Sequence, residues 1–409
     1  MIRNCVIIGG SHAGSQFAIS LRQGGWLGNI TIIGEERDYP YHRPPLSKTF
    51  LSGEKKIEDI LLRPAELYEK SRISIRLGER VKSIDRANKS VITNNNNNII
   101  NYDKLVIATG ARVRKIPVPG SETEGVYYLR NSDDVNKIKS RVIANDHAVI
   151  IGGGYIGLET AASLRKQGMK VTVIEAMARV LQRVTAPELS NFYKRIHDEE
   201  GVEIFEEVIA TEFKKIDKKI HILTSCGKTF IGDMVIVGIG VIPNIELAES
   251  AGLAVKNGVE VNQFCQTSDP EIYAIGDVSW HYNEIYERFL RLESVPNATE
   301  QAKIAALHIN EKPKAYNSLP WFWSDQYDLK LQIAGLSEGY NHIVIRGDIE
   351  KGRSFSAFYF KDNNLLAVDA VNSPREFMFT KMVLTKGQKL NKEILSNNSL
   401  DLKSAIMNQ

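Results

Sequence analysis

Cysteine is scarce in this sequence. It occurs three times in 409 residues, at Cys5, Cys226 and Cys265, and these positions are far apart. The odd number and the wide spacing exclude a disulfide framework and the paired spacing that is typical of a metal site. We therefore expect reduced thiols, a cytoplasmic compartment and no bound metal.

Long apolar runs and an excess of one charge are also missing. No apolar segment approaches the roughly 20 residues that span a bilayer, and the first apolar run ends at Gly9, which is too early for a signal peptide. Lysine and arginine number 52 against 49 aspartates and glutamates, a net charge of +3. This balance does not favour a polyanion. We expect neither a membrane nor nucleic acid as a partner.

Two glycine-containing stretches have almost the same sequence. VIIGGSHAG (6–14) and VIIGGGYIG (149–157) each begin with an apolar run and lead into a segment with helical apolar spacing. A second apolar run follows each helix and ends at an acidic residue, Glu35 in the first copy and Glu175 in the second. Strand, glycine turn, helix and strand form a βαβ unit, so we expect an α/β fold with two Rossmann-like parallel sheets.

Each position in these turns has a physical role in holding a dinucleotide. The first glycine permits a tight turn, the second lets the backbone approach a pyrophosphate, and the third lets helix and strand pack closely. The helix N-terminus presents N–H groups to the phosphates, and the acid accepts hydrogen bonds from a ribose. The residues in these positions are Gly9, Ser11, Gly14 and Glu35 in the first copy, and Gly152, Gly154, Gly157 and Glu175 in the second.

Two dinucleotide sites in one chain indicate a redox enzyme. FAD and a nicotinamide are the natural pair, because they exchange a hydride when their rings stack. We assign the second copy to the nicotinamide, and Glu175 favours NADH because a carboxylate repels a 2′-phosphate. Arg179 and Arg183 leave NADPH open as an alternative. In the first copy, the hydroxyl of Ser11 either donates to a phosphate or stands in a slightly wider turn.

The remaining sequence completes three domains. The proline-rich stretch 39–48 reads as a loop, the asparagine tract as an exposed hairpin tip, and 295–310 as a helix. The tail has strand-like segments at 329–334, 342–346, 354–360 and 365–371 and a helix from Pro374. We predict an FAD domain from residues 1–113 and 247–322, an NAD domain from 114–246 and a C-terminal α/β domain from 323–409.

Several longer motifs resemble those of one family, the FAD-dependent NADH:ferredoxin reductases of oxygenase systems. The resemblance covers essentially the whole chain, including YHRPPLSK, LVIATGARVRKIPVPG, QTSDPEIYAIGDV, ESVPNATEQA and WFWSDQYDLKLQIAGLSEGY. It implies a glutathione-reductase-like fold. It also implies a flavoprotein that passes electrons from NADH through FAD to an acidic [2Fe–2S] ferredoxin, which serves a cytochrome P450 or a Rieske oxygenase.

The same resemblance implies a set of cofactor contacts. Arg43 pairs with phosphate, Val81 lies beside the adenine, Asp277 accepts from the ribityl chain, and Val295 presents its N–H to the flavin pyrimidine edge. The full FAD set is Gly9, Ser11, His12, Ala13, Gly14, Glu35, Arg43, Lys48, Val81, Thr109, Gly110, Arg130, Asp277 and Val295. The NAD set is Gly152, Gly154, Tyr155, Ile156, Gly157, Glu159, Glu175, Arg183 and Gly240.

Four residues are implied in catalysis, which needs no nucleophile in this class. Lys48 is expected as a cation near the flavin ring, with Glu159 facing it and orienting the nicotinamide carboxamide. Tyr155 is expected to cover the flavin until the nicotinamide arrives. Trp323 is the candidate for the electron exit. Basic residues around that exit, with Arg288, Arg291 and Lys303 as candidates, are expected to steer an acidic ferredoxin.

Other readings of the two-dinucleotide pattern stay open. Disulfide reductases need a reactive cysteine beside the flavin, and YHRPPLSK contains none. A reductase of rubredoxin or monodehydroascorbate has the same flavin chemistry and a different acceptor. A redox-sensing scaffold related to apoptosis-inducing factor is the alternative of another class, and the near-neutral charge counts against it.

Overall fold

The computed structural model describes residues 3–407, which fall into two units. Unit 1 comprises Met1–Arg43, Ile57–Arg112 and Val241–Pro320. Unit 2 comprises Pro44–Lys56, Val113–Gly240 and Trp321–Gln409, and so includes residues predicted for both the NAD and the C-terminal domain. The division into three domains therefore stays a prediction.

A five-stranded parallel sheet forms the centre of unit 1. Its strands, in spatial order, are β19 (Ile272–Ala274), β7 (Lys104–Ile107), β1 (Asn4–Ile8), β2 (Asn29–Gly34) and β3 (Ile73–Leu77). The apolar runs of β1 and β7 are buried, as expected for parallel strands covered on both faces. Because the chain continues from β1 to β2 on one side and β7 lies on the other, the strand order reverses at β1. Ligands of such sheets bind at the carboxyl ends of the strands at that point.

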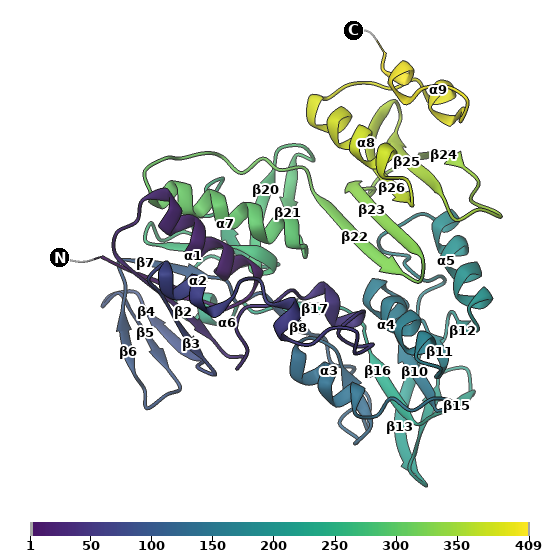
Figure 1. Cartoon of the computed structure of the whole chain (residues 1–409), viewed down its shortest axis with the longest axis horizontal. Helices are drawn as coiled ribbons and strands as arrows, with labels where there is room; N and C mark the ends of the chain where they lie inside the picture. Colours follow the sequence, from purple (N-terminus) through teal and green to yellow (C-terminus); the bar gives the residue numbers. More distant parts are fainter. Residues whose placement is uncertain (1–2, 408–409) are drawn as a thin grey trace. The chain divides into compact units, whose positions relative to one another are not determined.

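Helices cover one face of this sheet and an antiparallel sheet covers the other. Helices α1 (His12–Gly24) and α7 (Val295–Ile309) lie side by side in Figure 1 and share one apolar core with Tyr68 of α2 (Ala65–Lys70). The opposite core includes β4 (Val81–Asp85), β5 (Ser90–Thr93) and α6 (Glu246–Ser250), and β6 (Ile99–Asn101) pairs with β5. The exposed asparagine tract joins β5 to β6, which confirms the predicted hairpin tip.

Smaller elements complete unit 1. The chain forms short turns of 3-10 helix at η2 (Glu58–Ile60) and η3 (Gly276–Val278). The paired strands are β8 (Ala111–Val113) with β17 (Val241–Pro243), and β20 (Ser279–Asn283) between β18 (Val259–Val261) and β21 (Arg288–Leu290).

Unit 2 repeats the same sheet. Its parallel strands, in spatial order, are β12 (Val202–Phe205), β11 (Lys170–Ile174), β10 (His147–Ile151), β16 (Met234–Val237) and β9 (Val126–Tyr128). The second glycine turn follows the central strand β10, as the first follows β1. The remaining elements of this part are η1 (Pro44–Ser47), α3 (Ser132–Lys139), α4 (Tyr155–Lys166), α5 (Pro187–Glu199), β13 (Ala210–Ile216), β14 (Lys219–Thr224) and β15 (Thr229–Gly232).

The tail of unit 2 is an antiparallel sheet with helices. Its strands, in spatial order, are β22 (Trp321–Gln326), β23 (Leu329–Gly335), β26 (Asn364–Val371), β25 (Phe355–Lys361) and β24 (His342–Gly347). Helices α8 (Pro374–Lys386) and α9 (Lys392–Ser396) and the short η4 (Leu402–Ala405) follow. The α/β class, the two Rossmann-like sheets and the C-terminal α/β fold are thus confirmed.

One local expectation was wrong. Residues 39–48 were predicted to be an irregular loop, and Pro44–Ser47 instead form the 3-10 turn η1. The two prolines fix φ near −65°, which suits the first turn of a helix.

Candidate functional site

The first glycine turn, in unit 1, has two positions that only glycine can occupy. Gly9 has a φ of +117°, and a Cβ atom there would lie 2.1 Å from the carbonyl oxygen of Ala108. A Cβ atom on Gly14 would lie 2.0 Å from the carbonyl oxygen of Gly9. Ser11 has φ −118° and ψ −156°, which any residue can adopt. The serine is therefore compatible with the turn.

Arg43 ties this turn to the rest of unit 1. Its Nε donates to Oγ of Ser11 at 3.2 Å, its Nη1 donates to the hydroxyl of Tyr41 at 2.9 Å, and it forms an ion pair with Glu36. Burial lowers the pKa of Arg43, but Glu36, Tyr41 and Asp277 outweigh burial and raise it overall. The structure thus brings together three residues predicted for FAD, Ser11, Arg43 and Asp277.

The turn that carries Asp277 packs against the start of helix α1. A Cβ atom on Gly276 would lie 3.1 Å from Cβ of Ala13 and 3.7 Å from Cβ of Ala298 in the first turn of α7. Val295 opens α7, and the N-cap Ser294 accepts from the N–H of Asn297. The N-termini of α1 and α7 therefore meet the Asp277 turn, as the predicted FAD site requires.

A buried glutamine that sequence reasoning missed holds this turn. Oε1 of Gln301 accepts from the N–H of Gly276 and from Oγ of Ser279, both at 2.8 Å. Its Nε2 donates to Nδ1 of His281 at 3.2 Å, so the other ring nitrogen of His281 carries the proton. Burial lowers the pKa of His281 to about 4, so the ring is neutral at neutral pH.

The other residues predicted for FAD are distributed more widely. Oγ1 of Thr109 donates to the carbonyl oxygen of Asn244, whose Nδ2 donates back to the carbonyl of Thr109, each at 2.8 Å. Glu35 is exposed and pairs with Arg80 at 3.2 Å. His12 and Val81 are buried, and the ring of His12 lies 5.5 Å from that of His42. Gly110 has a φ of +63°, and its carbonyl oxygen accepts from the N–H of Asn244 at 3.0 Å. Their roles stay predictions.

Unit 1 has the donors that a pyrophosphate needs. The first turn of α1 contains no acidic residue, so its N–H groups and its positive dipole end face no competing carboxylate within the helix. Arg43 adds a half-buried cation beside Ser11. A dinucleotide such as FAD fits these residues.

The second glycine turn, in unit 2, has the same construction with more space. Gly152 has a φ of +109°, and a Cβ atom on Gly157 would lie 2.1 Å from the carbonyl oxygen of Gly152. A Cβ atom on Gly154 would meet no atom of residues 3–407 within 4 Å, apart from its chain neighbours. This space at the N-cap of α4 suits a phosphate that approaches the backbone. Ile156 is exposed in the first turn of α4.

Glu175 holds the second turn through both of its carboxylate oxygens. Its Oε2 accepts from the N–H of Gly153 at 2.6 Å, and its Oε1 accepts from the N–H of Met177 at 2.7 Å. Arg183 is exposed, and a Cβ atom on Gly240 would lie 3.7 Å from its Nη2. The structure therefore brings the predicted NAD residues Arg183 and Gly240 close together.

Lys48 and Glu159 form a buried ion pair within unit 2. Nζ of Lys48 lies 2.6 Å from Oε2 of Glu159, and the glutamate side chain is 2% exposed. Oγ of Ser47 donates to the same carboxylate oxygen and Oγ of Ser324 donates to Oε1, both at 2.6 Å. Lys48 also donates to the carbonyl oxygen of Pro44 at 3.2 Å and to Ser47 at 3.3 Å. The predicted pairing is present, and the two serines are partners that sequence reasoning missed.

Aromatic side chains continue from Tyr155 into the tail of unit 2. The ring of Tyr155 lies 5.1 Å from that of Phe322, and the ring of Trp323 lies 5.5 Å from that of Trp321. Burial raises the pKa of Tyr155 well above its usual range, so its hydroxyl stays neutral. Arg130 also belongs to unit 2, where its N–H donates to Asp134 at 3.1 Å. The roles predicted for Tyr155, Trp323 and Arg130 stay predictions.

The three basic residues predicted to steer a ferredoxin differ in their exposure and in their partners. Arg291 is largely buried, pairs with Glu293 at 2.6 Å and donates to the carbonyl oxygen of Asp277 at 3.3 Å, so it is committed to unit 1. Lys303 is more exposed and pairs with Glu300 at 2.6 Å. Arg288 lies on strand β21.

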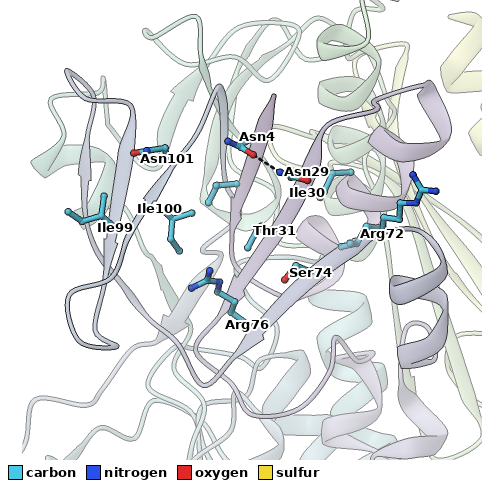
Figure 2. Close-up of a pocket in the computed structure, with 12 residues that line it drawn as sticks. Asn4, Asn29, Ile30, Thr31, Arg72, Ser74, Arg76, Ile99, Ile100 and Asn101 are labelled. Carbon is cyan, nitrogen blue, oxygen red and sulfur yellow. Dashed lines mark hydrogen bonds between the residues drawn. The ribbon is translucent and has the colours of Figure 1, made fainter. Parts of the chain in front are cut away.

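Two cysteines and one cavity of unit 1 include none of the residues predicted for the cofactors. Cys5 and Cys265 are buried, and burial raises the pKa of both thiols. A cavity of about 580 Å³ lies among the early residues of β1 and β2 together with β3 and β6. Figure 2 shows it with the 2.9 Å hydrogen bond from Asn29 to Asn4. It has no residue of the predicted sites, which follow the carboxyl ends of the strands.

Comparison with known proteins decides the family. Residues 3–302 match the sequence profile of the family described as pyridine nucleotide-disulphide oxidoreductase, and residues 321–406 match one described as reductase C-terminal. The chain belongs to the pyridine nucleotide-disulphide oxidoreductase family.

Similar members of this family are named as reductases. Putidaredoxin reductase of Pseudomonas putida is 42% identical over 98% of this chain and 96% of its own. Rhodocoxin reductase of Rhodococcus erythropolis is 41% identical over 98% of this chain and 94% of its own. A chain in the solved structure of the covalent putidaredoxin reductase–putidaredoxin complex matches this chain with a TM-score of 0.95 and 41% identity. The match covers 98% of each chain. The predicted resemblance is confirmed.

Proposed function

We propose that this protein is an FAD-dependent NADH:ferredoxin reductase whose [2Fe–2S] ferredoxin serves a cytochrome P450 or a Rieske oxygenase. The observation that carries the proposal is the pair of glycine turns, one at the centre of each parallel sheet. Unit 1 offers Arg43 and two helix N-termini for a resident dinucleotide. Unit 2 offers open space at Gly154 for a second one.

FAD supplies the step from a two-electron donor to a one-electron acceptor. The chain itself has to bind both dinucleotides, orient the nicotinamide and balance charge. Glu159 is suited to orientation, because the carboxylate is fixed by Lys48 and two serine hydroxyls and still has acceptor capacity for an amide N–H. In the proposal it receives the carboxamide of the nicotinamide.

Lys48 acts through its charge in this proposal. Its ammonium group has three N–H donors, and Glu159, Ser47 and the carbonyl of Pro44 already accept from it. A field effect on the reduced cofactor needs no further hydrogen bond. Tyr155 covers the flavin and Trp323 passes electrons outward in the same proposal.

The preference for NADH is proposed to depend on Glu175. Its two oxygens are held by backbone N–H groups, so the carboxylate is fixed and charged where a 2′-phosphate would bind. The guanidinium of Arg179 is held within the loop, where it donates to the carbonyl oxygens of Gln182 at 3.3 Å and Thr185 at 2.8 Å, so in the proposal it does not pair with a 2′-phosphate. Arg183 is the exposed arginine of this loop and contacts the coenzyme in the proposal.

The acceptor is proposed to be an acidic [2Fe–2S] ferredoxin, and the compartment the cytoplasm. The names of the similar reductases, whose acceptors are putidaredoxin and rhodocoxin, support the first point. Free thiols at all three cysteines of the chain agree with the second. Among residues 3–407, no helix combines the length and the apolar composition needed to cross a membrane.

An anaerobic titration tests the proposal. The purified protein receives one equivalent of NADH while the flavin absorbance is recorded, and a [2Fe–2S] ferredoxin is then added. We expect rapid bleaching followed by rapid reoxidation. Persistent bleaching that ferredoxin cannot discharge would instead indicate another acceptor or a scaffold role, and absence of bleaching would contradict both dinucleotide assignments.

A further inference from the structure

The loop after Glu175 is attached to other parts of unit 2 at its start, middle and end, and the N–H of Val180 adds a hydrogen bond to Oε1 of Glu206 at 3.0 Å. We call residues 176–186 the coenzyme loop. At its start, Met177 donates to Glu175 at 2.7 Å, and in its middle the N–H of Leu181 donates to the carbonyl oxygen of Gly153 in the glycine turn at 3.0 Å. At its end, Oγ1 of Thr185 donates to Oδ2 of Asp369 at 2.6 Å. The last attachment joins the loop to the C-terminal sheet.

The backbone of the coenzyme loop does not sit in a relaxed conformation. Leu181 has a φ of +56°, a left-handed region that a branched side chain rarely adopts. Its side chain is buried, so the strained turn is enforced by packing. A loop of this kind needs anchors outside itself to keep its shape.

Asp369 holds the end of the coenzyme loop from the C-terminal sheet. Its side chain is 1% exposed on β26, and its Oδ2 accepts from Thr185 and from the hydroxyl of Tyr359 on β25, each at 2.6 Å. The two hydroxyl oxygens lie 2.9 Å apart, and the Tyr359 hydroxyl also accepts from the N–H of Ala186 at 3.3 Å. Thr185 and Ala186 are thus both held from the C-terminal sheet, where α5 begins.

Oδ2 of Asp369 and the hydroxyl oxygens of Thr185 and Tyr359 are all in mutual contact and form a triangle. The number of protons on these oxygens decides how many of the three contacts are hydrogen bonds. An ionised Asp369 leaves two protons for three contacts, whereas a protonated Asp369 allows a hydrogen bond on every side. Burial raises the pKa of Asp369 to about 6, although both hydroxyls work against this shift. In either state Oδ2 is the atom on which both hydroxyls converge, so the geometry of the anchor is kept.

We propose that Asp369 is a positioning residue for the nicotinamide coenzyme, which holds Thr185 and thereby fixes the coenzyme loop. The loop carries Arg183 and contacts the glycine turn, so its shape sets how the turn and the arginine face the dinucleotide. The inference rests on the proposed function, because it assigns this turn to NADH. No residue in the triangle needs to touch the coenzyme.

Steady-state kinetics of the full-length flavoprotein test this role, with NADH as donor and ferricyanide as acceptor. We expect Thr185→Val to raise the KM for NADH about tenfold, the effect of losing one buried hydrogen bond, with kcat at saturating NADH nearly unchanged. Thr185→Ser keeps the hydroxyl and should restore the wild-type KM. Asp369→Asn should shift KM in the same direction as Thr185→Val.

Ser356→Ala is the matched control. Ser356 is buried on β25 next to β26, and its hydroxyl has no partner among the described residues, so its removal should leave KM and kcat unchanged. A wild-type KM in Thr185→Val, or a fall in kcat with KM unchanged, would overturn the anchor while leaving the proposed function intact. A wild-type protein that does not oxidise NADH would overturn both.

Discussion

Lys48 and Glu159 are paired at 2.6 Å in the interior of unit 2, and serine hydroxyls donate to both oxygens of that carboxylate. Lys48 follows the turn η1, and Glu159 lies in α4, directly after the second glycine turn. The lysine side chain is 17% exposed and the glutamate 2%. A pair so deeply buried is costly to break, because the remaining charge loses its counter-ion and cannot regain water.

The first prediction concerns this pair. Glu159→Gln should lower the free energy of unfolding by about 3 kcal/mol, because Lys48 keeps a buried, unbalanced charge. Adding Lys48→Met should recover part of the loss. Urea denaturation measures both changes. Lys166→Met is the control, since Lys166 and Glu54 join the same two segments through an exposed 2.8 Å pair, which should contribute less than about 1 kcal/mol.

The same lysine allows a redox measurement. In the proposed function its charge favours the reduced cofactor, so Lys48→Met should make the flavin midpoint potential more negative while FAD content stays normal. Spectroelectrochemical titration of the variant measures the potential. Normal FAD content with an unshifted potential would remove Lys48 from the catalytic residues.

In the second glycine turn, Gly154 borders open space, whereas Gly157 packs against the backbone of the protein. Gly154→Ala should leave thermal stability unchanged, because the added Cβ meets no atom of the described residues within 4 Å beyond its chain neighbours, yet it should raise the KM for NADH at least several-fold. Gly157→Ala should destabilise the fold, because its Cβ would lie 2.1 Å from a backbone oxygen. Thermal melts and NADH titrations distinguish the two. An unchanged KM in Gly154→Ala would mean that no phosphate approaches there.

Gln301 provides a test of the FAD side. Gln301→Leu leaves the N–H of Gly276 without its buried acceptor, which costs about 1–3 kcal/mol, while the hydroxyl of Ser279 keeps the carbonyl oxygen of Gly276 as an acceptor at 3.0 Å. Because these groups shape the Asp277 turn, the purified variant should contain less FAD per chain. Gln263→Leu makes the same chemical change at an exposed position of unit 1 and should retain full FAD content.

The glycine turns could be predicted because their requirements are local. A positive φ at Gly9 and close packing at Gly14 follow from a strand, a turn and a helix that are consecutive in sequence. Ser11 also follows local rules, since its backbone angles suit any residue. Its partner Arg43 was expected only as a phosphate ligand.

The polar partners could not be predicted, because long-range contacts decide them. Ser324 reaches Glu159 across 165 positions of sequence, and Asp369 reaches Thr185 across 184. Strand β22 was missed for the same reason. Its Ser324 and Gln326 are polar yet buried, with Glu159 and His197 as partners, so the alternation that marks a strand is absent. Similarly, α5 contains the buried His197, which weakens its apolar face.

Two buried groups in unit 2, His197 and Asp369, change the stability of the fold in opposite directions as the pH changes. Burial lowers the pKa of His197 to about 4, so below its unfolded value of 6.5 the unfolded chain binds a proton that the folded chain does not. This group therefore destabilises the fold as pH falls from 6.5 to 4. Burial raises the pKa of Asp369 from 3.8 to about 6, so between these values the folded chain holds the extra proton. This group therefore destabilises the fold as pH rises from 3.8 to about 6.

Each contribution amounts to about 3 kcal/mol across its pH range, so the two nearly cancel in the wild-type protein. Asp369→Asn removes one of them, and its free energy of unfolding should fall more steeply than that of the wild type between pH 6.5 and pH 4. His197→Gln should show the reverse, a smaller fall on acidification. The tyrosines near Asp369, at positions 155, 193 and 359, have raised pKa values and stay neutral throughout. Urea denaturation at half-unit pH steps measures the slopes, and parallel curves for all three proteins would contradict both assignments.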